Sequence, residues 1–173
     1  TDLYLIRGGW ETGMDSLYPN SLLRNDSNRA FIDVTYESNL LTYNASHTAS
    51  WVDYNNDGWV DLFVGNEQRP SELFKNNGDG TFTEVSQEAG ISIDNWVKGC
   101  FWGDVNNDGF PDAYVSIFLD SNRLYINQGK NEMGVVTFTE EAATWGVQLP
   151  IVSFPTFMFD YNNDGLLDIF CTN

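Results

Sequence analysis

The sequence contains few basic residues: its 173 residues include 8 Lys and Arg against 25 Asp and Glu, a formal net charge of −17. A surface of that charge repels polyanions, so nucleic acid is excluded as a partner over most of the molecule. His47 is the only histidine, and no Gly-x-Ser-x-Gly, paired-His metal or phosphate-loop motif accompanies it. The sequence therefore offers no recognisable catalytic constellation, and its charge favours a cation as partner.

Cysteine is also scarce, since Cys100 and Cys171 are the only two and cannot build a disulfide framework. Each lies in an apolar, strand-like run, so we expect two buried free thiols. No apolar run approaches the roughly 18 residues that a membrane-spanning helix needs. The first residues, Thr1-Asp2-Leu3-Tyr4, contain neither a basic start nor an apolar stretch. Membrane insertion is not predicted, and we expect the true N-terminus, with any export signal, to lie upstream.

Apolar and aromatic residues, by contrast, are plentiful. Hydrophobic residues make up 42% of the chain, with 6 Trp, 8 Tyr and 12 Phe. A chain of this length and composition is able to bury a core. The aromatic share of 15% is typical of β-rich folds, where flat side chains pack between pleated layers. We therefore expect an ordered, strand-rich domain.

A nine-residue motif, Asp-x-Asn-Asn-Asp-Gly-x-x-Asp, occurs three times, at 53–61, 104–112 and 160–168. The second copy begins 51 residues after the first, and the third begins 56 residues after the second. Periods of this length are near the upper end for propeller blades and far from those of the common helical repeats. The repeat therefore predicts a β-propeller architecture.

Strand-like segments surround each loop in a constant order. An apolar or aromatic run precedes the loop (49–52, 100–103, 157–159), and we expect this run to be a strand covered on both faces. A second run starts on the last Asp of the loop (61–64, 112–115, 168–171), with a fourth copy at 2–5. Third and fourth runs follow at 21–25, 72–76 and 123–127, and at 30–34, 81–85 and 137–141, each before a turn such as 88–90 or 144–146.

These patterns predict an all-β fold made of propeller blades, each with four antiparallel strands. The expected units are approximately 1–46 (a partial blade), 47–97, 98–152 and 153–173 (a partial blade), so about three blades are present in a single propeller segment. Because a closed propeller typically needs about four to eight blades, we infer a segment of a larger propeller. Its neighbouring blades would come from the same chain or from another one.

The loops are predicted to bind calcium, about three ions in all, one in each complete loop. Calcium takes roughly six to eight oxygen ligands, and alternate positions of a tightly curled loop supply carboxylate, amide and carbonyl oxygens. An EF-hand is excluded, because it needs Glu at position 12, where this chain has Val64, Val115 or Cys171. Magnesium is less suitable because it demands a small octahedral shell. The predicted ligands are Asp53, Asn55, Asp57, the carbonyl of Trp59 and Asp61; Asp104, Asn106, Asp108, the carbonyl of Phe110 and Asp112; and Asp160, Asn162, Asp164, the carbonyl of Leu166 and Asp168.

On these loops, on Phe101-Trp102-Gly103-Asp104 and on the segment 73–82, the sequence resembles the FG-GAP and VCBS repeat family, which includes the propellers of integrin α subunits. The resemblance covers nearly the whole chain. It implies a seven-bladed propeller, usually extracellular or at the cell surface, with calcium loops on one face and partner contacts from variable loops elsewhere. Two departures limit the transfer: the first unit has a long insertion, 8–20, and the loop that ends at Asp2 lacks its first eight positions.

The favoured function is therefore a calcium-binding extracellular, cell-surface or periplasmic scaffold for structure, adhesion or recognition of a protein or a carbohydrate. Two alternatives stay open: a propeller part of a carbohydrate-active enzyme of the lyase or dehydratase type, and a self-assembling structural protein. Trp51 and Trp102 occupy equivalent positions and are expected in packing between blades, whereas Trp10 and Trp96 are the expected partner contacts. Asn-x-Ser triplets at Asn25 and Asn44 match the glycan acceptor pattern, which also arises by chance in Asn-rich loops.

Overall fold

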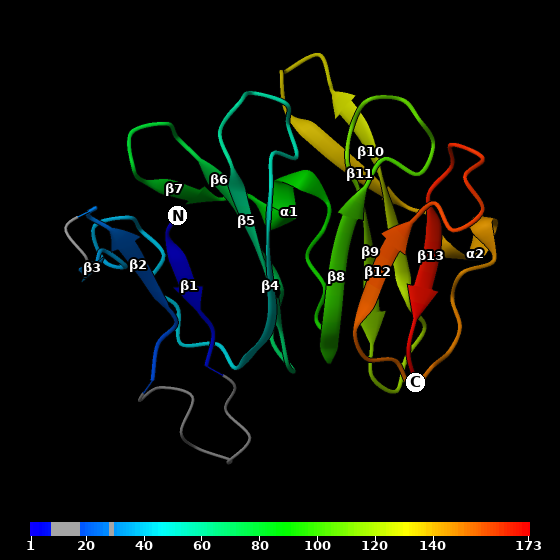
Figure 1. Cartoon of the computed structure of the whole chain (residues 1–173), viewed down its shortest axis with the longest axis horizontal. Helices are drawn as coiled ribbons and strands as arrows, with labels where there is room; N and C mark the ends of the chain where they lie inside the picture. Colours follow the sequence, from blue (N-terminus) through cyan, green and yellow to red (C-terminus); the bar gives the residue numbers. More distant parts are fainter. Residues whose placement is uncertain (8–17, 28–29) are drawn as a thin grey trace.

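Short antiparallel sheets follow one another along the chain (Figure 1). The computed structural model describes residues 1–7, 18–27 and 30–173, and within these ranges the strands form four sheets. The sheets are β1 (Leu3–Leu5), β2 (Ser21–Asn25) and β3 (Phe31–Asp33); β4 (Ser46–Val52), β5 (Asp61–Asn66), β6 (Glu72–Asn76) and β7 (Phe82–Glu84); β8 (Val97–Gly103), β9 (Asp112–Ile117), β10 (Arg123–Lys130) and β11 (Val136–Glu140); and β12 (Thr156–Phe159) with β13 (Asp168–Cys171). Neighbouring strands are antiparallel and joined in sequence order, so the all-β prediction of blade-like sheets is confirmed.

Two single-turn helices follow the fourth strands of the complete sheets, where the sequence predicted turns. They are α1 (Ser86–Ala89) and α2 (Ala142–Trp145). Each ends at a glycine, Gly90 or Gly146, in the left-handed conformation, with φ of 77° and 71°. Glycine adopts this conformation without the steric cost of a Cβ atom, and its N–H closes the helix end. No helix in the described ranges is long and apolar enough to cross a membrane.

The first strands of successive sheets, β4, β8 and β12, lie side by side (Figure 1). They are only partly buried, whereas β5 and β9 are buried along their whole length. The expectation that the first strand is covered on both faces was therefore wrong. β4 and β8 are edge strands of their sheets, while β5 and β9 are interior strands sandwiched between neighbouring sheets.

Three apolar layers fill the spaces between the sheets. One lies between the first and second sheets and includes Leu22 and Phe74, and another lies between the second and third and includes Phe63 and Val115. The last, between the third and fourth, includes Met158. This stacking of sheet faces is the packing expected of neighbouring propeller blades.

Tryptophans at equivalent positions occupy these layers, as the sequence predicted. Trp102 lies against Phe63 of the second sheet and Phe138 of the third, with ring centroids 5.9 and 5.8 Å away. Trp51 contacts Tyr4 and Phe82 in the layer before it, at 6.3 and 6.4 Å. Both rings therefore serve packing between sheets.

The two tryptophans that were predicted as partner contacts are Trp96 and Trp10. Trp96 is half-buried and packs beside Phe118, with the Lys98 ammonium 5.5 Å from its ring centroid, so packing within the fold occupies part of its surface. Trp10 lies outside the described residues.

Each complete sheet contacts its loop through a glycine near the point where the third strand leads into the fourth. The ring of Trp59, at loop position 7, covers Gly78, and the ring of Phe110 covers Gly129. Both glycines have positive φ, 78° and 65°. A side chain at Gly78 would place its Cβ 2.9 Å from the Trp59 ring, so the hairpin needs glycine there for space as well as for backbone conformation.

Replacing Gly78 with alanine should therefore lower the free energy of unfolding more than the same change at Gly80. Both residues have positive φ, so both substitutions incur the left-handed penalty of about 1–2 kcal/mol. An added Cβ at Gly80 meets nothing within 4 Å, whereas one at Gly78 collides with the Trp59 ring. Overpacking should add about 1 kcal/mol or more to the Gly78→Ala effect. Urea unfolding of the two variants checks this, and equal losses of stability would contradict the proposed contact.

Candidate functional site

The three motif loops occupy one edge of the molecule. Each joins the first strand of its sheet to the second: 53–61 links β4 to β5, 104–112 links β8 to β9, and 160–168 links β12 to β13. Because β4, β8 and β12 lie side by side, their loops project in the same direction, toward the top of Figure 1. The repeat thus gathers three similar turns on one rim.

The side chains at positions 1, 3 and 5 curl inward onto the backbone of their own loop. In the first loop, the N–H of Asp57 donates to Asp53 Oδ1 (3.1 Å) and to Asn55 Oδ1 (2.9 Å), and the N–H of Gly58 donates to Asp53 Oδ2 (2.9 Å). Asp57 Oδ1 in turn accepts the N–H of Trp59 at 2.9 Å. The other loops repeat these bonds at 2.8–3.1 Å. In each loop, positions 1 and 3 therefore accept the same N–H, that of position 5, and position 5 accepts the N–H of position 7.

Position 4 has a conformational role that the sequence analysis missed. Asn56, Asn107 and Asn163 all have positive φ, between 52° and 60°. Asparagine is one of the few residues besides glycine that tolerates this left-handed conformation. The repetition of Asn at a position with no predicted ligand role was the available signal.

Position 9 ties the loop of each complete sheet to that sheet. Asp61 and Asp112 are fully buried. Asp61 Oδ2 accepts the N–H of Tyr54 (3.3 Å), at the start of the loop, and Oδ1 accepts the N–H of Asn76 (2.7 Å), at the end of β6. Asp112 accepts the N–H of Val105 and of Asn127 in the same way, at 2.9 and 2.8 Å. The carboxylate is thus a bridge between loop and third strand as well as a predicted ligand.

Each partial sheet has one of these two hydrogen bonds: the first sheet has the bond from the third strand, and the last has the bond from the start of the loop. Asp2 accepts the N–H of Asn25 at 2.8 Å, and Asp168 accepts the N–H of Tyr161 at 3.1 Å. The asparagines at the ends of the third strands, Asn25, Asn76 and Asn127, recur in the sequence, but their bonds to position 9 could not be read from it.

Among the described residues, no basic side chain forms an ion pair with the two buried carboxylates. Burial, together with the charges of Asp57 and Asp53, raises the pKa of Asp61 to about 7 against the lowering effect of the N–H donors. Burial likewise, together with the charges of Asp108 and Asp104, raises the pKa of Asp112 to about 6 against its N–H donors. The carboxylates of each of these loops thus lie close enough to repel one another.

The third loop is more exposed. Hydrogen bonds from the loop backbone, that of Gly165 first, lower the pKa of Asp160. Its carboxylate is therefore held in the charged form by the loop itself.

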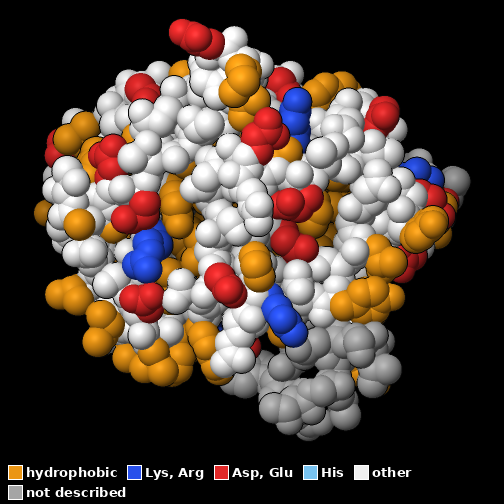
Figure 2. Space-filling view, turned by 180° about the vertical axis from the view of Figure 1, so that it is seen from behind, with side chains coloured by type: hydrophobic (Ala, Val, Ile, Leu, Met, Phe, Trp, Pro, Cys, Tyr) orange, Lys and Arg blue, Asp and Glu red, His pale blue; other side chains and the backbone are white. Residues whose placement is uncertain are grey.

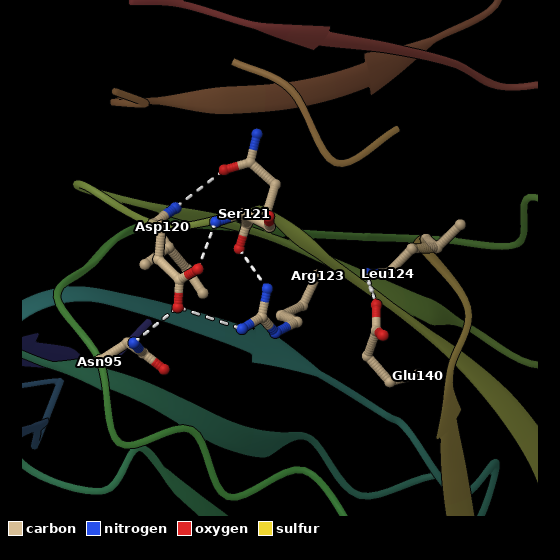
Figure 3. Close-up of polar contacts among 8 residues, drawn as sticks. Asn95, Asp120, Ser121, Arg123, Leu124 and Glu140 are labelled. Atoms are coloured by element: carbon tan, nitrogen blue, oxygen red, sulfur yellow. Dashed lines mark hydrogen bonds and ion pairs between the residues drawn. The ribbon is translucent and has the colours of Figure 1, made fainter. Parts of the chain in front are cut away.

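Basic side chains do not neutralise the loops. In the described part of the chain, the ion pairs are His47–Glu67, Lys98–Glu67 and Arg123–Asp120, and they lie near the other ends of the strands. Figure 3 shows Asp120 held by Arg123 (3.2 Å), Asn95 (3.0 Å) and the N–H of Ser121 (2.7 Å). Figure 2 shows acidic side chains spread over the face behind that of Figure 1, with few basic ones among them.

The donor set suits a hard cation, although the side chains are not gathered around one point. Among the described residues, no three His, Cys, Asp or Glu side chains lie close enough together to hold a metal ion. The loop carboxylates accept hydrogen bonds from backbone N–H groups instead. The predicted ligands also include Asn side-chain oxygens and backbone carbonyls, which are not among those four residue types. Every predicted ligand atom is an oxygen, which is the chemistry that calcium requires.

Comparisons with known proteins agree with the repeat structure. Residues 53–115 match the FG-GAP-like repeat family. Cartilage acidic protein 1 of Xenopus tropicalis is 30% identical over 119 residues, which cover 68% of this chain and 18% of that protein. The Homo sapiens protein of that name is 28% identical over 166 residues, 93% of this chain and 24% of its own length. Integrin alpha-7 of Rattus norvegicus is 30% identical over 168 residues, 86% of this chain and 14% of its own. The chain thus spans a quarter or less of these relatives.

Without calcium, the fold should lose stability as the pH rises from about 4 to about 7. The pKa values of Asp61 and Asp112 are higher in the folded state than the ordinary value of 3.8, so the folded state binds more protons than the unfolded state in this range. Urea unfolding in the presence of a chelator, at a series of pH values, measures the decline. Asp61→Asn removes one of the two carboxyls and should flatten it. A decline of the same size in that variant would contradict the assignment to Asp61.

Proposed function

Because this chain belongs to the FG-GAP-like repeat family, we propose that it is a calcium-stiffened segment of a β-propeller that serves as a scaffold for adhesion or recognition. The observation that carries the calcium assignment is the accumulation of buried, unpaired carboxylate charge in the loops, where the pKa values of Asp61 and Asp112 are raised to about 7 and about 6. A divalent cation would offset that charge, which no basic side chain of the described chain does.

Three ions are proposed, one in each loop, held by the oxygens of positions 1, 3, 5, 7 and 9. Positions 1 and 3 already share one backbone donor, the N–H of position 5, and position 5 accepts the N–H of position 7, so rotations of these side chains would exchange N–H partners for a metal ion. Bound calcium would supply two positive charges and cross-link the loop. The residues themselves hold the loop curled and keep the carboxylate of position 9 attached to the third strand.

The scaffold role rests on what the residues are used for. The nine-residue motifs form the loops, their side chains at position 7 cover glycines where the third strand leads into the fourth, and apolar residues of the strands fill the layers between sheets. The relatives include a protein named for cartilage and an integrin α chain, which supports a non-enzymatic, extracellular or cell-surface role with protein or carbohydrate partners. We also propose that the units 1–46, 47–97, 98–152 and 153–173 continue into further blades, seven in all.

Calcium should raise the midpoint of thermal unfolding relative to a chelator, and the rise should grow with free calcium. Binding to the folded state alone stabilises by RT ln(1 + [L]/Kd), about 2.7 kcal/mol for a site at 100 times its Kd. An extracellular protein needs only weak sites, with Kd of about 10⁻⁴ to 10⁻³ M. Calorimetric scans across a calcium series check both points, with magnesium as control. An unchanged midpoint would contradict calcium binding, and stabilisation complete at submicromolar calcium would contradict the extracellular assignment.

Asp108→Ala should remove one bound ion and leave two. Asp108 supplies the carboxylate of position 5 and orients the N–H of Phe110, so its loss disables the second loop while the ligands of the others remain. Isothermal titration calorimetry counts the ions. Asp79→Ala is the matched control, because Asp79 lies in a hairpin outside the loops, where its carboxylate accepts bonds from Thr81. Loss of all three ions in Asp108→Ala, or of one in Asp79→Ala, would contradict the assignment.

A further inference from the structure

Long-range hydrogen bonds connect the first loop to the second, one directly and one through β10. Asn56 Nδ2 donates to the carbonyl oxygen of Gly109 at 2.8 Å, across 53 residues of sequence. Asn127 Nδ2, on β10, donates to the carbonyl oxygen of Tyr54 at 2.9 Å, across 73 residues. The same Asn127 amide also donates to the carbonyl of Pro111 in the second loop at 3.1 Å. Neither asparagine is a predicted metal ligand.

The bond from Asn56 acts on the peptide group that holds the ligands of the second loop. The carbonyl of Gly109 and the N–H of Phe110 belong to one planar peptide unit. That N–H donates to Asp108 Oδ1 at 2.9 Å, while the N–H of Gly109 donates to Asp104 Oδ2 at 2.8 Å. Fixing this peptide unit from the first loop therefore fixes the donor to the Asp108 carboxylate, while the donor to Asp104 belongs to the adjoining peptide unit.

Asn127 makes the reciprocal connection. Its backbone N–H holds Asp112 at position 9 of the second loop, and its side chain holds the peptide unit between Tyr54 and Asn55 in the first loop. Asn127 is almost fully buried, at 1% exposure, so this connection has a fixed geometry. A change in the backbone conformation of either loop is thus felt by the other through the buried Asn127.

The third loop has no such connection within the described chain. Asn107 has the same left-handed conformation as Asn56, with φ of 57° against 52°, yet its side chain makes no hydrogen bond to any described residue. Near these loops the third and fourth units meet through apolar groups instead, with Leu167 of the third loop against Gly103 of β8. The first two loops form a pair from which the third is separate.

We propose that the first two loops bind calcium with positive cooperativity, with Asn56 and Asn127 as positioning residues, while the third loop binds independently. This inference rests on the calcium function proposed above. An ion in one loop orders its backbone, and the two bonds carry part of that order into the other loop, which then loses less conformational entropy on binding. Linkage requires the effect to be reciprocal.

One glycine in each loop, Gly58, Gly109 or Gly165, supplies a backbone amide signal for its own site in NMR titrations of the whole chain with calcium chloride. The Gly58 and Gly109 signals should respond together and more steeply than the Gly165 signal. In Asp108→Ala, the midpoint of the Gly58 response should move to about fivefold higher calcium, at the lower end of typical coupling between sites. In Asp57→Ala, the Gly109 midpoint should move by the same factor. The Gly165 response should not change in either variant.

Asn56→Ala tests the route of the coupling. It should reduce the effect of Asp108→Ala on the Gly58 midpoint to less than twofold. Asn107→Ala is the matched control: it removes the same side chain from the same left-handed conformation without an inter-loop bond, so it should leave the cooperativity of a protein with intact Asp108 unchanged. Equal effects of Asn56→Ala and Asn107→Ala on cooperativity would overturn the role of Asn56.

The outcomes separate this inference from the proposed function. If no glycine signal responds to millimolar calcium, the calcium function fails and the cooperativity fails with it. If all three respond but Asp108→Ala leaves the Gly58 midpoint unchanged, calcium binding stands and the coupling is wrong. Amide hydrogen exchange in chelator gives a readout without metal: Asn56→Ala should speed exchange at Gly109 and Phe110, and unchanged exchange there would also overturn the proposed connection.

Discussion

A buried aspartate at the end of the loop in each of the two complete sheets is the constraint on which the site depends. Asp61 and Asp112 are fully buried, and each spreads its two oxygens between the start of the loop and the third strand. Burial of a carboxylate without a cation is unfavourable, and two N–H donors compensate only in part, which is why the pKa values remain raised. The carboxylate that closes the loop through its hydrogen bonds therefore also adds a buried negative charge to it. A loop closed in this way has a defined backbone conformation but an uncompensated negative charge.

The remaining loop features follow from that closure. With both ends attached to one carboxylate, nine residues must reverse direction in a small space, and the left-handed residues at positions 4 and 6, such as Asn56 and Gly58, make the reversal. The large side chain at position 7 then lies over the hairpin glycine, as Trp59 does over Gly78. Position 7 thus combines a predicted ligand, its carbonyl, with a side chain that packs on the sheet. The proposed calcium binding and the stability of the sheet consequently involve the same few residues.

The sequence predicted those features that repeat locally and missed those that depend on contacts between units. Loops, strands and the inter-sheet place of Trp102 could be predicted, because each copy carries the same alternation and the same turn residues. The bonds of Asn127 could not, since its partner Tyr54 lies in another unit, 73 residues away. The burial of β4 and β8 was misjudged for a related reason: an apolar run does not reveal whether its strand lies at the edge or in the middle of a sheet. The metal ligands remain a prediction from residue chemistry.

The two ends of the strands differ in how their acidic side chains are paired. Away from the loops, scarce basic residues are used in ion pairs: Lys98 is buried against Glu67, and Arg123 holds Asp120 (Figure 3). At the loop end, Lys75 and Lys130 line a cavity of about 360 Å³ beside Asp57, but neither forms an ion pair with a loop carboxylate in the described chain. The ion pairs thus lie at one end, while the loop carboxylates at the other have none among the described residues. Because cations in solution vary between compartments while lysines do not, the calcium binding proposed above would make the loop end the part of the fold whose rigidity responds to the surroundings.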